Sequence, residues 1–337
     1  MRSTHTKSAV LAHARGAVGI ESIYLGEPGP GEVLLRMEAC GVCHSDLFVA
    51  GLEKLPLAPL TLGHEGIGRV ESTGPGVAGW LPGDRAGVTF LGTSCGSCEW
   101  CLTGRERFCP KQTNFGYTLH GALSEYAIVP ASALIRVPEE LPAAVAAPLC
   151  CAGWTAFGAL REAALERGQS VALFGLGGLG HLALQLAKMQ GLRIAAVDIA
   201  ADKLDMAREW GAEAAVHGDS AGRTLQKEYG GVDAALVLTP SSSAIQQAFR
   251  SLKRNGTLVL VGLATNQYEL PLVDTVLKGI AIRGSYLGSR QDLAEVFRLA
   301  GAGFLKPHIE THSLAETPDV LERLRRGELM GRAVITW

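Results

Sequence analysis

Four closely spaced cysteines are the strongest chemical signal in the sequence. Cys95, Cys98, Cys101 and Cys109 follow the pattern C-x2-C-x2-C-x7-C inside a loop that contains Gly and Ser. Four thiolates at this spacing can close a tetrahedron around Zn(II) at about 2.3 Å each, which leaves no position for a substrate. The pattern therefore predicts a structural zinc site. Two disulfides or an iron–sulfur cluster are alternatives that use the same residue type.

A glycine-rich loop is the second signal. Gly175, Gly177, Gly178 and Gly180 form a G-x-G-x-x-G motif directly after the apolar run 170–174, and Asp198 ends the next apolar run. In this context the glycines let the backbone approach a pyrophosphate, and the following helix offers its free N–H groups. The acidic residue can accept hydrogen bonds from the adenosine ribose, and it would repel a 2′-phosphate. The motif therefore predicts a dinucleotide site that favours NAD over NADP.

A third set of residues is dispersed along the chain. Cys43 lies in GVCHSD at 41–46, His64 lies in GHEG at 63–66, and Cys151 belongs to a Cys-Cys pair. Two cysteines and one histidine form one of the known zinc shells that keep a fourth position open for a substrate oxygen. Residues of these types are also common as ordinary buried side chains. The residue pattern alone therefore leaves this second zinc site open.

Two regions of the chain have different sequence patterns, and their predicted folds could position these residues. From about Val33 to Pro138, short β-type runs alternate with Gly- and Pro-rich turns, which is typical of an irregular β domain. From about Ser170 to Ser285, buried parallel strands alternate with segments of helical spacing, which predicts a doubly wound α/β domain. These strands are expected at 170–175, 193–198, 232–239, 257–262 and 280–285. Two helices, at 293–300 and 319–327, and a strand at 332–337 are expected in the tail.

Composition limits the classes of function. The 337 residues suggest two domains, and 47% hydrophobic residues suffice for large cores. A formal net charge of −2 argues against nucleic acid or an anionic membrane as a partner. The uncharged stretch 141–160 is interrupted by Pro142, Pro148 and Gly153, so we interpret it as a buried linker rather than a membrane span. Eight cysteines without a recognisable secretory signal favour a reducing compartment, and we expect a cytoplasmic protein.

Several longer motifs resemble one known family. The stretches CGVCHSDL, GHEGIGRVESTGPGV, CGSCEWCLTGRERFC, APLCCAGWTAF, GLGGLGHLALQLAK and GRAVIT are similar to those of the zinc-containing medium-chain alcohol dehydrogenases, most of all to their bacterial and fungal tetrameric branch. The resemblance runs from about residue 30 to the end. It implies a GroES-like, mostly β catalytic domain at 1–152 and 287–337, together with a Rossmann NAD-binding domain at 153–286.

The resemblance also assigns roles to individual residues. It makes Cys43, His64 and Cys151 the ligands of a catalytic zinc, with Glu65 as an alternative ligand. Asp46 would hold His64 by a hydrogen bond and so fix its tautomer.

Further roles follow from the same resemblance. Ser45 would take the proton of the alcohol, and Phe90 would line the substrate pocket. The family's terminal proton-relay histidine has no counterpart in 46–54, so Ser45 is expected to pass its proton through the ribose to solvent. The other implied cofactor contacts are His44, Thr155, Leu179, Lys203, Val261 and Arg332.

These assignments predict an NAD-dependent zinc alcohol dehydrogenase that acts reversibly on a primary or secondary alcohol. Two Zn(II) ions per chain and a homotetramer are expected, with a dimer as the alternative assembly. A polyol or aryl-alcohol dehydrogenase of the same fold is the nearer alternative function. A non-catalytic NAD-binding protein is the farther one.

Overall fold

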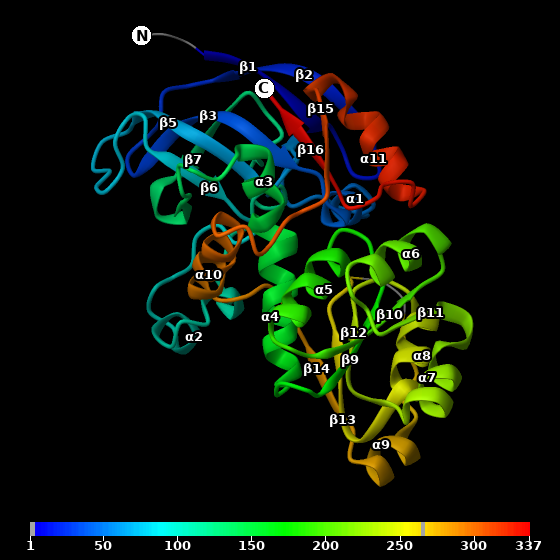
Figure 1. Cartoon of the computed structure of the whole chain (residues 1–337). Helices are drawn as coiled ribbons and strands as arrows, with labels where there is room; N and C mark the ends of the chain where they lie inside the picture. The colour runs from blue at the N-terminus through cyan, green and yellow to red at the C-terminus, as the bar shows by residue number, and fades with distance from the viewer. Residues whose placement is uncertain (1–3, 264–266) are drawn as a thin grey trace. The chain divides into compact units, whose positions relative to one another are not determined.

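The chain forms two compact units in the computed structural model, which describes residues 4–263 and 267–337 (Figure 1). The first unit comprises Met1–Cys151, Ser289–Gly301 and Pro307–Trp337. The second comprises Ala152–Gly288 and Ala302–Lys306.

The first unit is built on two β-sheets. A seven-stranded sheet has the order β15-β16-β3-β5-β6-β8, with β7 paired to β3, and a three-stranded sheet has the order β2-β1-β4. Neighbouring strands are antiparallel except for β15 and β16, which are parallel. The strands are β1 (Thr4–Leu11), β2 (Val18–Leu25), β3 (Glu32–Gly41), β4 (Leu60–Thr61), β5 (Gly66–Thr73), β6 (Arg85–Val88), β7 (Tyr126–Pro130), β8 (Ile135–Arg136), β15 (Ile309–His312) and β16 (Arg332–Thr336). The helices are α1 (His44–Ala50), α2 (Glu99–Leu102), α3 (Ala143–Pro148), α10 (Arg290–Gly301) and α11 (Thr317–Arg325).

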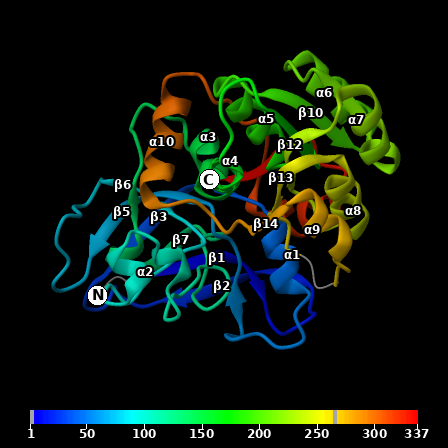
Figure 2. The same cartoon turned by 90° about the horizontal axis from the view of Figure 1, so that it is seen from below.

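The strands of the β domain begin earlier than the residue pattern indicated. The hairpin of β1 and β2, which lie side by side in Figure 2, precedes the predicted start near Val33. Its first strand is difficult to recognise because it buries polar side chains as well as apolar ones. Thr6 and Ser8 are almost fully buried, and their hydroxyls lie 2.9 and 2.7 Å from that of Ser124. These hydrogen bonds compensate for the loss of water at polar positions.

The second unit is a doubly wound α/β domain, as predicted. Its six parallel strands have the order β11-β10-β9-β12-β13-β14. In Figure 1, α4 lies on one side of this sheet, and α7 and α8 lie on the other. The strands are β9 (Ser170–Phe174), β10 (Arg193–Asp198), β11 (Ala214–His217), β12 (Val232–Val237), β13 (Leu252–Leu260) and β14 (Ala281–Gly284). The helices are α4 (Trp154–Ala163), α5 (Gly180–Met189), α6 (Ala201–Glu209), α7 (Ala221–Tyr229), α8 (Ser242–Ser251) and α9 (Leu272–Lys278).

Two strands of this sheet differ from the prediction. Strand β11 is additional: its four residues are too short and Ala-rich to stand out, and they are ordered by parallel pairing with Ala195–Asp198 of β10. Strand β13 begins at Leu252 rather than at 257, and its register against β12 shifts after Val232.

The segment expected as a buried linker is helical. Residues 143–163 form α3, a π-helical stretch at Leu149–Gly153, and α4. By length and composition alone this stretch could cross a membrane, but 78% of its most apolar window is buried inside the protein. A mostly buried apolar helix is common in the core of a globular protein, so it is weak support for a membrane span.

Candidate active site

A buried cluster of two cysteines, a histidine and a glutamate lies in the first unit. Sγ of Cys43, a ring nitrogen of His64, a carboxylate oxygen of Glu65 and Sγ of Cys151 all lie within 4.8 Å of one another. Sheet pairing explains much of this convergence. Cys40 of β3 is opposite Gly66 of β5, so the chain after β3 runs beside the residues that precede β5.

Asp46 organises this cluster from the first turn of α1. Its Oδ2 accepts a hydrogen bond of 2.9 Å from the N–H of Cys43, the residue that caps this helix. Its Oδ1 accepts from the N–H of Gly63 at 3.2 Å and lies 3.3 Å from Nδ1 of His64. A hydrogen bond from Nδ1–H leaves Nε2 of His64 as the free, metal-binding nitrogen.

The donor set fits a zinc ion. Nε2 of His64 and Oε2 of Glu65 are buried and have no hydrogen-bond partner among the residues that the structure describes. The Sγ atoms of Cys43 and Cys151 are 3.9 Å apart. Hydrogen bonding from the Cys151 thiol lowers the pKa of Cys43 well below its usual range, although burial opposes this. Two thiols, one of them readily ionised, and one free imidazole nitrogen match an open zinc shell.

Glu65 also forms a buried ion pair with Arg332. The guanidinium Nη2 of Arg332, on β16, contacts Oε1 of Glu65. Burial raises the pKa of Glu65 to about 7, although the positive charge of Arg332 acts in the opposite direction. Gly41 leaves room for this carboxylate, since a Cβ there would lie 1.9 Å from Oε2 of Glu65. Arg332, expected as a cofactor contact, therefore already neutralises a carboxylate of the cluster.

Two further predicted residues border the cluster. Oγ of Ser45 is 3.8 Å from Sγ of Cys43. The ring of Phe90 contacts that of His64 edge to face, with centroids 5.3 Å apart. His44, the first residue of α1, is exposed.

The four clustered cysteines also converge. The Sγ atoms of Cys95, Cys98, Cys101 and Cys109 lie within 4.8 Å of one another, and all eight cysteines of the chain are free thiols. Hydrogen bonds from Ser97 lower the pKa of Cys95 to about 5. This geometry gives four sulfur ligands, which fits a closed structural zinc shell.

The glycine-rich loop of the second unit connects β9 to α5. Gly175 has φ +96°, a backbone conformation that favours glycine. A Cβ on Gly180 would lie 2.0 Å from the carbonyl oxygen of Gly175, whereas a Cβ on Gly177 would meet no atom within 4 Å. The open backbone at Gly177 therefore leaves space for a ligand at the start of the helix, which fits a bound pyrophosphate.

Asp198 ends β10 beside this loop. Its Oδ2 accepts from the N–H of Leu176 at 2.7 Å, and its Oδ1 accepts from the N–H groups of Ile199 and Ala200 at 2.8 and 3.0 Å. Oδ2, which accepts one of these three bonds, retains a lone pair for a ribose hydroxyl. Asp198 is thus fixed in place without losing its capacity to accept further hydrogen bonds.

The remaining predicted contacts are distributed over the second unit. Leu179 immediately precedes α5, and Lys203 lies half-buried on α6. Thr155 is buried in α4, and the N–H of Val261, after β13, bonds to the carbonyl of Val237 at 3.0 Å.

A cavity of about 310 Å³ at the C-terminal ends of the strands contains polar residues that the sequence did not single out. Three of them are Asp219, Ser241 and Ser243, which follow β11 and β12. Polar residues that directly follow a buried strand are candidates for a binding site, and this position was the signal available in the sequence. For Asp219 the signal was missed because β11 was not predicted. The lining residues are Phe174, Gly175, Val197, Asp198, Ile199, Gly218, Asp219, Thr239, Ser241, Ser243 and Ala244.

Comparison with known proteins identifies both halves of the chain. Residues 29–139 match the family model described as the alcohol dehydrogenase GroES-like domain, and residues 178–302 match the zinc-binding dehydrogenase family. An alcohol dehydrogenase of Geobacillus stearothermophilus is 41% identical over 336 residues, which cover 98% of both chains.

Solved structures agree with this result. The crystal structure of the alcohol dehydrogenase from Aeropyrum pernix aligns with a TM-score of 0.92 at 31% identity, covering 98% of this chain and 100% of the other. A structure described as an NAD-dependent alcohol dehydrogenase aligns with a TM-score of 0.89 at 28% identity, covering 98% and 99% of the two chains.

Proposed function

Because the chain belongs to the zinc-containing medium-chain alcohol dehydrogenases, we propose that Cys43, His64 and Cys151 hold its catalytic zinc. As a member of this family, the chain is an NAD-dependent enzyme that transfers hydride reversibly between an alcohol and the cofactor. The observation that carries the site assignment is the buried Nε2 of His64, which faces two thiols and has no hydrogen-bond partner among the described residues. Glu65 is proposed as an alternative ligand.

The residues around this site have distinct tasks in the proposal. A bound zinc ion supplies Lewis acidity toward a substrate oxygen, and NAD supplies the hydride acceptor. Asp46 keeps the tautomer of His64 by accepting from Nδ1. Oγ of Ser45 accepts the proton of the alcohol while its own hydroxyl proton passes through the ribose to solvent, and Phe90 provides an apolar wall beside His64.

The cofactor-binding residues are proposed from the glycine loop and its surroundings. The open backbone at Gly177, together with the adjacent Gly178, is proposed to bind the pyrophosphate, while Gly175 and Gly180 permit the tight turn. Asp198 accepts from the adenosine ribose. The further proposed contacts are His44, Thr155, Leu179, Lys203, Val261 and Arg332.

We also propose that each chain binds two zinc ions with separate roles. Cys95, Cys98, Cys101 and Cys109 would hold the second ion, whose closed shell contributes folding free energy rather than chemistry. Metal analysis should return about two zinc ions per chain. Cys43→Ser should remove activity with NAD and one zinc but preserve thermal stability, whereas Cys95→Ser should mainly lower the melting temperature. If both variants gave the same phenotype, the division of roles would be wrong.

The alcohol substrate is tested by a panel of primary, secondary, benzylic and polyol substrates with NAD, followed at the absorbance of NADH. We expect turnover of small primary or secondary alcohols. Turnover restricted to polyols or to aryl alcohols would instead support the alternative functions of the same fold.

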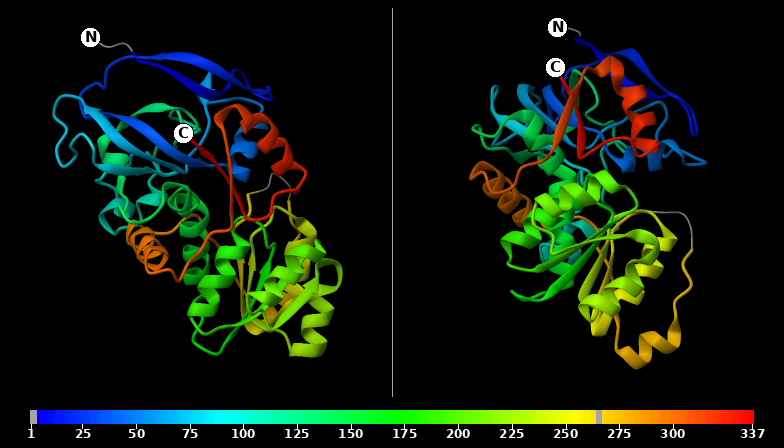
Figure 3. Two further views of the ribbon diagram at one scale, coloured as in Figure 1. Left: turned by 45° about the horizontal axis from the view of Figure 1, so that its top comes forward. Right: turned by 45° about the vertical axis from the view of Figure 1, so that its right-hand side comes forward.

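An exposed apolar surface on the second unit supports the proposed homo-oligomer. Leu272, Val273, Val276 and Leu277 of α9 are each about two-thirds exposed (67%, 70%, 68% and 68%), and α9 lies at the end of this unit in Figure 3. Strand β14 is the last strand of the sheet, so one of its edges has no partner strand among the described residues. A second copy could cover the helix face and extend the sheet.

We propose that this surface forms one interface of a homotetramer. Light scattering after size exclusion should report a tetramer for the native chain and a smaller species for Val276→Glu. Light scattering that reports a monomer for the native chain would contradict the assembly.

A cytoplasmic location is proposed from the thiols. Eight free cysteines, including two sets arranged to bind metal, are compatible with a reducing compartment. Fractionation of cells that produce the protein should place it with the soluble cytoplasmic proteins.

A further inference from the structure

The cavity beside the glycine loop extends beyond the position expected for the ribose. Asp198 and Gly175 form part of its wall at the ends of β10 and β9, and the wall continues past β11 and β12 to Asp219 and Ser243. In doubly wound domains the pyrophosphate lies at the glycine loop and the ribose at the acidic residue. The adenine base must therefore occupy the part of the cavity that lies beyond Asp198.

This outer part of the cavity combines apolar walls with a polar edge. Ile199 and Ala244 supply apolar surface for the faces of a base. Ser241 Oγ accepts from the N–H of Ala244 at 3.3 Å, which leaves its own O–H free to donate. Ser243 also presents a hydroxyl, and Asp219 presents a carboxylate that can only accept hydrogen bonds.

The carboxylate of Asp219 is available for a ligand. The structure pairs its carboxylate with Nδ1 of His217, which lies 3.7 Å from Oδ2, beyond hydrogen-bond distance. Its side chain is 82% exposed, so it needs no partner within the protein. An acceptor beside two hydroxyl groups complements the adenine edge, which has an amino donor at N6 and acceptors at its ring nitrogens.

We propose that Asp219 reads the base of the cofactor by accepting a hydrogen bond from the 6-amino group of adenine. Ser241 and Ser243 complete the contact by donating to ring nitrogens. A 6-oxo purine places an acceptor where Asp219 also has an acceptor, so the pocket discriminates against it. This inference rests on the proposed cofactor site and adds a specificity-determining residue to it.

The test compares the binding of NADH with that of its hypoxanthine analogue by isothermal titration calorimetry, which needs no turnover. The native protein should bind the hypoxanthine analogue about 3- to 10-fold more weakly, the range for one net hydrogen bond. In Asp219→Asn the amide can donate to the 6-oxo group, so the ratio of the two dissociation constants should fall below about 2.

Asp202→Asn is the matched control, because it removes the same charge from α6 at a position that does not line the cavity. It should keep the native ratio. A native ratio near 1, or an unchanged ratio in Asp219→Asn, would overturn the role of Asp219. Asp198→Ala should weaken the binding of both ligands by a similar factor. If Asp198→Ala affected neither ligand, the proposed cofactor site itself would be wrong.

Discussion

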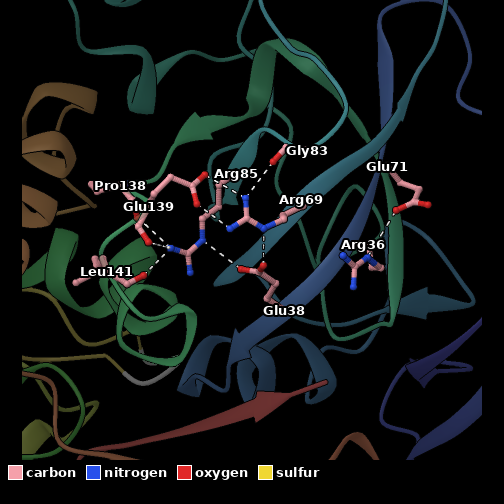
Figure 4. A network of polar contacts seen from close by, with 9 residues as sticks. All are labelled: Arg36, Glu38, Arg69, Glu71, Gly83, Arg85, Pro138, Glu139 and Leu141. Carbon is pink, nitrogen blue, oxygen red and sulfur yellow. Dashed lines mark hydrogen bonds and ion pairs between the residues drawn. The ribbon is translucent and has the colours of Figure 1, made fainter.

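Arg85 is expected to stabilise the first unit far more than Arg36, although both form ion pairs on the same sheet (Figure 4). The guanidinium of Arg85 is buried and donates from Nε to Glu38 at 3.1 Å. Its Nη1 donates to the carbonyls of Pro138, Glu139 and Leu141 at 3.0, 3.2 and 2.6 Å. These bonds fix the chain just before α3, the helix that leads to Cys151.

The effect of Arg85→Met can be worked from these contacts. The carbonyl of buried Leu141 would lose its donor, which costs about 1 to 3 kcal/mol. The carbonyl of half-buried Pro138 would also lose a donor, at a fraction of that cost. Glu38 keeps a second partner, because Arg69 donates to its Oε1 at 2.9 Å. We therefore expect a loss of about 3 to 4 kcal/mol in the free energy of unfolding, near the lower end for a broken buried pair.

Guanidinium unfolding and thermal scans of the zinc-loaded protein measure this loss, which should lower the melting temperature by about 6 to 16 °C. Arg36→Met is the matched control. Arg36 lies 3.6 Å from Glu71, and the two side chains are 55% and 52% exposed. Such a pair contributes under about 1 kcal/mol because water screens it. Equal destabilisation by the two substitutions would refute the argument that burial and the hydrogen bonds to backbone carbonyls make Arg85 more stabilising than Arg36.

Three further expectations concern the loop, the sheet and the proton path. Gly180→Ala should lower the melting temperature because its Cβ would lie 2.0 Å from a backbone oxygen, whereas Gly177→Ala should preserve it and weaken NADH binding in calorimetry. Burial raises the pKa of Asp233, but Ser170 and Lys253 lower it below its usual value. Its stabilising contribution is therefore complete above about pH 5 and is lost as the pH falls through the lowered pKa. Asp233→Asn should thus flatten the decrease in stability measured from pH 5 to pH 3. Ser45→Ala should lower alcohol oxidation by about 10² to 10⁴ while Ser45→Thr retains it, and full activity in Ser45→Ala would exclude its role as proton acceptor.

The sequence by itself determined the features that are local along the chain. The four cysteines at 95–109 lie within one loop, so their spacing alone limits how they can converge. The glycine loop is likewise fixed by its place between one strand and the next helix. The alternation of apolar runs and helical segments from 170 to 285 sufficed for the doubly wound domain, because central parallel strands such as β9 and β12 are buried on both faces, although β14 at the edge is exposed.

The sequence was less informative where burial does not follow polarity. Thr6 and Ser8 are buried polar residues, so β1 lacks the apolar alternation of a typical strand. Strand β11 has four residues, and its pairing with β10 rather than its own composition orders it. The uncharged stretch at 141–160 has no polar face from which a helix period could be read.

Only the tertiary structure brought the dispersed groups together. Cys43 and Cys151 are separated by 108 positions, and Glu65 and Arg332 by 267. Antiparallel pairing places β16 beside β3, and the N–H of Val42 bonds to the carbonyl of Ala333 at 2.9 Å. This pairing brings Arg332 to the buried carboxylate of Glu65, a contact that no spacing in the sequence indicates. Contacts of this kind depend on which strands are neighbours, and strand order is decided by packing over the whole unit.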